Sequence, residues 1–282
     1  MKIDSHQHFW KYNVTDFGWI KDPMKEIRRD FLPEELRNIL QLANYDASIA
    51  VQARQIISET DWLLELASQY NFISGVVGWM DLCSDNLNQQ LEFYSANKKL
   101  VGVRHVLHDE PDLNFMLRPD FLKGIYKIGQ YNLTYDILIY PEHLPNTLQF
   151  VKQFPNQSYV LDHIAKPKII NGKISPWKEN IRKLAQYPNV SCKLSGMVTE
   201  ADIINWKPED FWPYLDIIME SFGTNRVMIG SDWPVCSVAG MYGKVMNIVE
   251  NYIAGFSLSE KAGILGDNAT HIYNIKSEPK IS

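Results

Sequence analysis

Two histidines near the N-terminus and a distant aspartate could together bind a metal ion or activate a water molecule. His6 and His8 are two positions apart near the N-terminus, a spacing that places both imidazoles on one face of a strand. Two such imidazoles can chelate a zinc-like ion, or they can simply be satisfied by structural hydrogen bonds. Asp232 follows an apolar run, where a carboxylate either caps the next turn or acts in catalysis. A fold that brings Asp232 beside the two histidines would let them hold and deprotonate water.

Three further side chains at predicted strand ends could stabilise charge or bind polar groups. Arg104 lies in a short apolar run, and its planar donors suit a carboxylate, a carbonyl oxygen or vicinal hydroxyl groups. His163 follows Asp162, a pair that serves either structure or chemistry. Lys193 stands inside an apolar run, which is costly unless its ammonium finds a partner at the strand end. Each is therefore a candidate for a site where the strands end.

Aromatic and other polar side chains recur at the same places. Tryptophans usually pack in a core or at its rim, but as a group they could form flat walls for a small polyhydroxylated ring. The tryptophans near predicted strand ends are Trp10, Trp19, Trp79 and Trp233. The sequence leaves open the roles of four other residues close to strand ends, namely His105, His108, Glu110 and Asp136.

A repeated strand–helix pattern must position these residues. Short runs rich in Val, Ile and Leu read as strands buried on both faces, and helical segments separate them, as at Pro33–Arg37, Trp62–Tyr70, Asp120–Tyr131, Pro208–Phe222, Ser259–Leu265 and 268–273. Alternating strands and helices of this number predict one closed (β/α)8 barrel over residues 1–282. A doubly wound open sheet is the alternative, but it usually has a glycine-rich turn after its first strand. The predicted strands are Lys2–His8, Ala47–Ala53, Phe72–Asp81, Leu100–Val106, Leu133–Tyr140, Ser158–Ile164, Val190–Gly196 and Arg226–Pro234.

Composition excludes several classes of protein. The net charge of −5, with scattered Lys and Arg, argues against a nucleic-acid surface. Three widely separated cysteines make neither a disulfide framework nor a CxxC pair. No apolar stretch is long enough for a membrane span, and the N-terminus does not resemble a signal peptide. We expect a cytoplasmic enzyme that acts on a small polar molecule and leave its oligomeric state open.

Several ordered motifs resemble amidohydrolase family 2, and in particular its lactonase branch. The opening Ile3–Trp10, the segment Gly102–His105, the Asp162-His163 pair, Cys192–Gly196 and Gly230–Pro234 carry the resemblance, together with Arg29–Pro33 and Gly266–Ala269. They run in order from the first residues almost to the last. Each is weak alone, and the ordered set is specific.

The resemblance implies a (β/α)8 barrel that hydrolyses its substrate at the carboxyl ends of the strands. It places metal ligands at His6, His8 and Asp232 and implies contacts to substrate from Arg104, His163 and Lys193. The fifth predicted strand, Leu133–Tyr140, lacks the histidine ligand found in much of the wider superfamily. One divalent, zinc-like metal, with His163 as a further ligand, is therefore expected in place of two. A metal-independent site is the alternative.

We therefore predict hydrolysis of a sugar-acid lactone, such as L-fuconolactone or L-rhamnonolactone, to the open aldonate. Asp232 would accept a proton from the attacking water, and Arg104 and His163 would stabilise the charge on the carbonyl oxygen. The residues expected to bind substrate are His105, His108, Lys193, Trp79 and Trp233. The alternatives are a metal-dependent decarboxylase or hydrolase of an aromatic or muconate-type acid, and a non-catalytic sugar-binding barrel.

Overall fold

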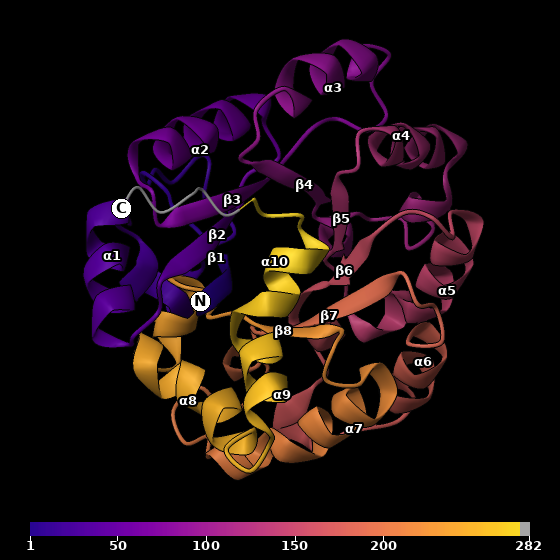
Figure 1. Cartoon of the computed structure of the whole chain (residues 1–282). Helices are drawn as coiled ribbons and strands as arrows, with labels where there is room; N and C mark the ends of the chain where they lie inside the picture. Colours follow the sequence, from indigo (N-terminus) through magenta and orange to yellow (C-terminus); the bar gives the residue numbers. More distant parts are fainter. Residues whose placement is uncertain (277–282) are drawn as a thin grey trace.

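The computed structural model describes residues 1–276 and shows a closed parallel β-barrel surrounded by helices (Figure 1). The eight strands are neighbours in chain order, and the ring closes where Gln7 forms a parallel bridge with Trp233. The predicted (β/α)8 barrel and its eight strands are confirmed. The strands are β1 (Ile3–Gln7), β2 (Ala47–Val51), β3 (Ile73–Gly78), β4 (Leu100–His105), β5 (Thr134–Ile137), β6 (Tyr159–Leu161), β7 (Val190–Leu194) and β8 (Val227–Ile229).

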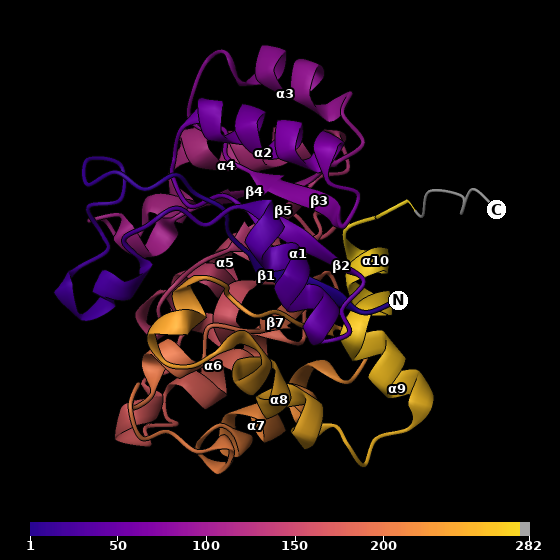
Figure 2. The same ribbon diagram turned by 90° about the vertical axis from the view of Figure 1, so that its left-hand side faces the viewer.

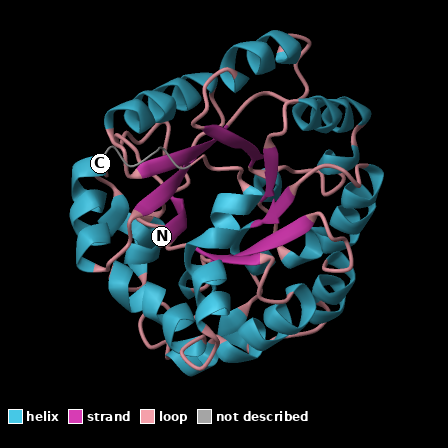
Figure 3. Ribbon diagram, viewed as in Figure 1, coloured by secondary structure: helices cyan, strands magenta, loops and turns pink. Residues whose placement is uncertain are grey.

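The helices cover the outside of the barrel, as Figure 3 shows by its colouring. Helix α1 begins at Pro33, whose missing N–H costs nothing in a first turn, and it buries Leu36 and Leu40, four residues apart on one face. The helices are α1 (Pro33–Leu42), α2 (Ile57–Gln69), α3 (Leu87–Ser95), α4 (Pro119–Gln130), α5 (Leu144–Gln153), α6 (Trp177–Leu184), α7 (Trp212–Phe222), α8 (Tyr242–Tyr252), α9 (Leu258–Ala262) and α10 (Asn268–Ile272).

The helix predicted over Pro208–Phe222 is divided in the structure. Pro208–Asp210 forms a separate 3-10 turn, and α7 begins at Trp212. Pro213 explains the break, because proline has no N–H and its ring clashes with the carbonyl group four residues earlier in a continuous helix. In the first turn of α7 the same residue is tolerated.

One end of the barrel is closed by the C-terminal helices. Ala269 of α10 and the adjacent Tyr273 pack against Ile3 and Met228 in a small apolar cluster. Figure 2 shows the N-terminus and α9–α10 at one end of the barrel and the long loop after β1 at the opposite end. An accessible site must therefore lie at the end opposite α10, where the strands terminate.

The strands end earlier than the apolar runs predict. His8, His163 and Asp232 all lie just beyond the last residue of their strands. His163 and Asp232 have positive φ angles of 54° and 59°, so the chain has already turned out of the sheet at both. These side chains consequently project from turns at the barrel mouth.

The remaining global expectations concern thiols and membranes. Cys83, Cys192 and Cys236 are free, as predicted. Within residues 1–276, no helix has the length and apolar character needed to cross a bilayer. Residues 277–282 belong to the predicted domain but lie outside the described part of the chain.

Candidate active site

A cavity of about 500 Å³ opens among the loops that follow the strands. This volume falls within the range of small-molecule sites, and this end of a (β/α)8 barrel is where such enzymes build their active sites. The apolar part of its lining includes Trp19, Met24 and Leu138. Its polar lining consists of His8, Arg104, His108, Asp109, Tyr140, His163, Lys166, Thr199, Glu200 and Asp232.

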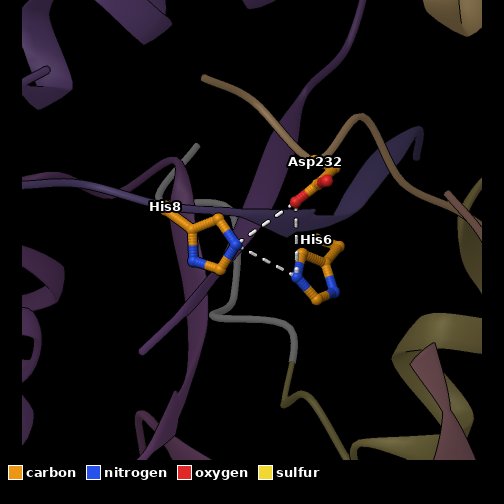
Figure 4. Close-up of side chains that lie close together, drawn as sticks. All are labelled: His6, His8 and Asp232. Atoms are coloured by element: carbon orange, nitrogen blue, oxygen red, sulfur yellow. Dashed lines mark hydrogen bonds and ion pairs between the residues drawn. The ribbon is translucent and has the colours of Figure 1, made fainter. Parts of the chain in front are cut away.

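His6, His8 and Asp232 lie close together (Figure 4), and His8 and Asp232 line this cavity. The Nε2 atoms of the two histidines are 3.3 Å apart. The Oδ1 atom of Asp232 is 3.3 Å from Nε2 of His8 and 3.8 Å from Nε2 of His6. All three side chains are buried. The structure thus brings together the three residues that the sequence analysis identifies as metal ligands.

Barrel closure fixes the relative positions of the three residues. The backbone N–H of Asp232 donates to the carbonyl oxygen of His6 at 2.8 Å. One residue earlier, the Ser231 hydroxyl donates to the buried Asp4 carboxylate at 2.6 Å. A side chain at Gly230 would meet Cβ of His6 at 2.8 Å, so β1 and β8 approach this closely only because Gly230 is glycine. The seam between the first and last strands therefore aligns Asp232 with the histidines.

The donor set fits a divalent metal ion. Nδ1 of His8 lies 2.7 Å from the carbonyl oxygen of Val51, so Nδ1 carries the proton and Nε2 keeps its lone pair. Nδ1 of His6 faces Asp162 Oδ1 at 3.3 Å. Metal-binding histidines commonly donate their second N–H to a carbonyl or carboxylate in this way.

The spacing of the donors agrees with their chemistry. Ligands about 2.1 Å from a tetrahedral ion are about 3.4 Å from one another, close to the 3.3 Å and 3.8 Å observed. Without a cation, a lone pair on each histidine would face the Asp232 carboxylate. Nη1 of Arg104 also approaches Nε2 of His6 at 3.2 Å, so a guanidinium N–H shares the lone pair that a metal would use.

His163 enters the cavity from an unusual backbone turn. Residues 163–166 have φ angles of 54°, 49°, 59° and 47°, a left-handed conformation that is costly for any residue with a side chain. The Trp177 indole N–H donates to the Ile164 carbonyl oxygen at 2.8 Å and holds the turn. Nδ1 of His163 lies 2.8 Å from Oγ of Ser195, and Nε2 lies 3.8 Å from Asp232 Oδ1. Burial lowers the pKa of His163 well below its usual value, so the imidazole is neutral.

Arg104 lies between the cavity and a buried network of charges. Its Nη1 atom donates to Asp162 Oδ2 at 3.0 Å, and its Nη2 atom donates to the Gln52 carbonyl oxygen. The side chain lines the cavity although it is only 3% exposed. Arg104 is thus held rigidly beside the predicted metal ligands.

Lys193, which the sequence analysis expects to bind substrate, lies outside the cavity lining. Its side chain is 0% exposed, and Nζ contacts Asp136 Oδ2 at 2.6 Å and Asp162 Oδ1 at 3.0 Å. Nζ also lies 3.2 Å from Nδ1 of His6. The ammonium therefore lies beside His6 inside the barrel, where two buried carboxylates compensate its charge.

Three other residues expected to bind substrate also lie outside the cavity lining. Trp233 is buried against Phe9 and Phe31. His105 faces Glu110 at 2.7 Å and stacks on an aromatic ring of the adjacent loop, and Trp79 is half-buried elsewhere. These are packing positions, the ordinary role of aromatic side chains.

His108 does lie in the cavity wall, where it stacks on Tyr140 with ring centroids 4.6 Å apart. Burial and the nearby Lys166 and Arg104 cations lower its pKa to about 3, so it is neutral. Of the two other residues left open, Glu110 pairs with His105, and Asp136 belongs to the buried Lys193 network.

The residues of the site without a predicted role include Asp162, Tyr140, Lys166 and Glu200. Asp162 and Lys166 flank His163 in the sequence, and their polar character at a strand end is a usable signal. Tyr140 ends a predicted strand run. Glu200 lies in a 3-10 turn beyond β7 (Val198–Glu200), and no sequence spacing connects it to the other three.

A buried glutamate shapes the loop after β2. Glu59 of α2 accepts hydrogen bonds from the backbone N–H groups of Ala53 and Arg54, and Ala53 lines the cavity. Burial raises the pKa of Glu59 to about 7, although these bonds and Arg54 oppose the rise.

Fold and site define a (β/α)8-barrel enzyme whose centre is built from histidines and an aspartate. The chain belongs to the amidohydrolase family, whose model matches residues 3–275. It is 37% identical to L-fucono-1,5-lactonase of Burkholderia multivorans, over 97% of this chain and 96% of that protein. An L-fucono-1,5-lactonase of Burkholderia ambifaria is 34% identical, over the same two shares.

A solved structure agrees with these relatives. An amidohydrolase from Burkholderia multivorans with bound zinc superposes with a TM-score of 0.94 and 37% identity, covering 98% of this chain and 100% of that one. The predicted family and the resemblance to its lactonases are confirmed.

Proposed function

We propose that this protein hydrolyses the lactone of a sugar acid to the open aldonate. The observation that carries the proposal is a carboxylate, Asp232, that lines a polar cavity and faces the Nε2 atoms of His6, His8 and His163. Such an arrangement activates water. The similarity to L-fucono-1,5-lactonases supports a sugar lactone as the substrate.

Asp232 is suited to accept a proton from the attacking water. Burial would raise its pKa, but the neighbouring His163 and His8 side chains and the Lys166 ammonium hold the pKa below its usual value. The carboxylate is therefore ionised at neutral pH and can act as general base. Once protonated, it can return the proton to the ring oxygen that leaves as the lactone opens.

The lactone carbonyl oxygen gains negative charge as water adds, and neighbouring donors stabilise that charge. Arg104 supplies a fixed cation at the cavity wall. If the Ser195 hydroxyl donates to Nδ1 of His163, Nε2 carries a proton that can be donated to the oxyanion. A metal held by His6, His8 and Asp232 would lower the pKa of a bound water and polarise the carbonyl group.

The cavity cations argue against the rival substrates. Arg104 is paired with Asp162 at 3.0 Å, and Lys166 is paired with Glu200 at 2.8 Å. An aromatic or muconate-type acid brings a carboxylate of its own, which needs a cation not already neutralised. A neutral ring with hydroxyl groups matches these paired charges better.

The test is proton release from a panel of aldonolactones, including the L-fucono, L-rhamnono and L-galactono compounds, with and without a chelator. We expect turnover of at least one lactone, and loss of rate with chelator if a metal is required. Asp232→Asn should lower kcat by about 10²- to 10⁴-fold and leave thermal unfolding little changed. Normal turnover by that variant would refute the mechanism, whereas decarboxylation of an aromatic acid, or binding without turnover, would favour an alternative function.

A further inference from the structure

An ion pair in the cavity wall has no part in the steps described above. Nζ of Lys166 donates to Oε1 of Glu200 at 2.8 Å, and the two side chains are 14% and 18% exposed. Both residues line the cavity that contains Asp232. The pair is therefore within reach of a molecule bound there.

Lys166 reaches the cavity wall from a strained, left-handed segment of the backbone. Lys166 ends the left-handed run that begins at His163 and includes the β-branched Ile164. This conformation is costly for any residue with a side chain, and strain of this kind concentrates at functional sites. His163 and Lys166 share one turn, so a ligand that contacts the reacting centre also lies near the ion pair.

The pair offers hydrogen-bonding groups of both kinds. Burial lowers the pKa of Lys166, but the Glu200 and Asp232 carboxylates raise it above its usual value, and the ammonium stays charged. One of its three N–H groups is used by Glu200. Within residues 1–276, Oε2 of Glu200 has no hydrogen-bond donor, whereas Oε1 also lies 3.4 Å from the Thr199 hydroxyl.

The Lys166 ammonium and the Glu200 carboxylate are about as far apart as the two oxygen atoms of a vicinal diol. Nζ and the nearest carboxylate oxygen are 2.8 Å apart, and two hydroxyl oxygens on adjacent staggered carbons are about 3 Å apart. Each hydroxyl group can both accept and donate, so one can accept from the ammonium while its neighbour donates to the carboxylate. The ring of Tyr140, 5.9 Å from Nζ at its centroid, continues the wall.

We propose that Lys166 and Glu200 form a subsite for two vicinal hydroxyl groups of the ring, and so determine specificity for a polyhydroxylated lactone. This inference rests on the proposed function. A carboxylate ligand would be repelled by Glu200, and an apolar ring would leave both charges without a compensating partner.

The test compares two six-membered lactones, L-fucono-1,5-lactone and the unsubstituted δ-valerolactone. Glu200→Gln and Lys166→Met each remove one half of the subsite. The control is Glu220→Gln, because Glu220 also forms an ion pair, with Arg182 at 2.9 Å, but is 61% exposed outside the cavity. Thermal unfolding of each variant verifies folding.

Both subsite variants should lower kcat/KM for the hydroxylated lactone about 10- to 100-fold, the loss expected for a hydrogen bond to a charged group. The change should lie mainly in KM, and δ-valerolactone should be hydrolysed within about threefold of the wild-type rate. The control should behave as wild type on both. Equal losses on both lactones, or none, would overturn the inference.

A binding measurement separates this inference from the proposed function. Calorimetry with the hydroxylated 1,5-lactam and with δ-valerolactam needs no turnover. Tighter binding of the hydroxylated lactam that is lost in Glu200→Gln would support the subsite even if wild-type protein hydrolyses no lactone. Equal binding of the two lactams would overturn the subsite even if lactones are hydrolysed.

Discussion

Gly196→Ala should lower activity by more than its loss of stability explains, because the added methyl group displaces His163. Gly196 follows β7 with a φ angle of +60°, and an ideal Cβ there would meet Nδ1 and Cγ of His163 at 2.4 and 2.5 Å. Gly172 has the same φ angle of +60°, and a Cβ there would meet nothing within 4 Å. Gly172→Ala is therefore a matched control that carries only the backbone cost.

The structure gives the magnitudes of both effects. The left-handed backbone costs about 1 kcal/mol with alanine, and overpacking adds about 1–3 kcal/mol, so Gly196→Ala should lose about 2–4 kcal/mol and Gly172→Ala about 1 kcal/mol. Ordinary contact begins at 3.4 Å, so the imidazole must move by about 1 Å. A misplacement of that size costs about 10²-fold in rate, and it also breaks the bond between His163 and Ser195.

The assay is lactone hydrolysis measured beside urea unfolding for wild type, Gly196→Ala and Gly172→Ala. We expect about 10²-fold lower kcat/KM for Gly196→Ala at temperatures where it is fully folded, and wild-type activity for Gly172→Ala. If folded Gly196→Ala retains wild-type kcat/KM, His163 does not have to occupy its observed position, and the reasoning is refuted.

Three other perturbations test the network, the metal site and a buried carboxyl group. Lys193→Met should lower the free energy of unfolding by about 3–5 kcal/mol, because two buried carboxylates lose their cation. The measurement is urea unfolding, with Lys183→Met at an exposed position as the control. Equal unfolding midpoints for the two variants would contradict the prediction. His8→Asn should bind zinc at least about 10-fold more weakly in equilibrium dialysis, whereas His271→Asn, exposed on α10, should match wild type. Glu59 has its pKa raised from 4.5 to about 7, so between these pH values the folded chain keeps a proton that the unfolded chain has lost, and stability falls as pH rises. Glu59→Gln should therefore gain up to about 3 kcal/mol relative to wild type between pH 5 and 8, and a pH-independent difference would argue against a raised pKa.

The barrel could be predicted because its pattern is local. Parallel strands buried on both faces read as short apolar runs, and Pro33 or the acids that follow it mark where a helix begins. Strand boundaries could not be predicted as well, because an apolar run does not show where the hydrogen bonds between strands stop. The run Ser158–Ile164 contains only three strand residues, Tyr159–Leu161, before the left-handed turn.

The sequence by itself determined the barrel, its family and the three converging residues His6, His8 and Asp232. Each lies at a strand end, and every strand of a closed parallel barrel ends on the same face, so the order of the chain suffices to bring them together. The depth of a side chain in the barrel is a different matter. Lys193 and Arg104 look alike in sequence, yet one is sealed beneath His6 and the other reaches the cavity.

Only the tertiary structure decided the partners of the charged side chains. Lys166 and Glu200 come from loops after different strands, and they form an ion pair because both loops turn toward the same cavity wall. The length of a loop does not predict this ion pair, because the direction of each turn depends on tertiary contacts such as the hydrogen bond from Trp177 to Ile164. Residue types near strand ends identify a site, and three-dimensional packing determines which of them face the cavity and which neutralise one another.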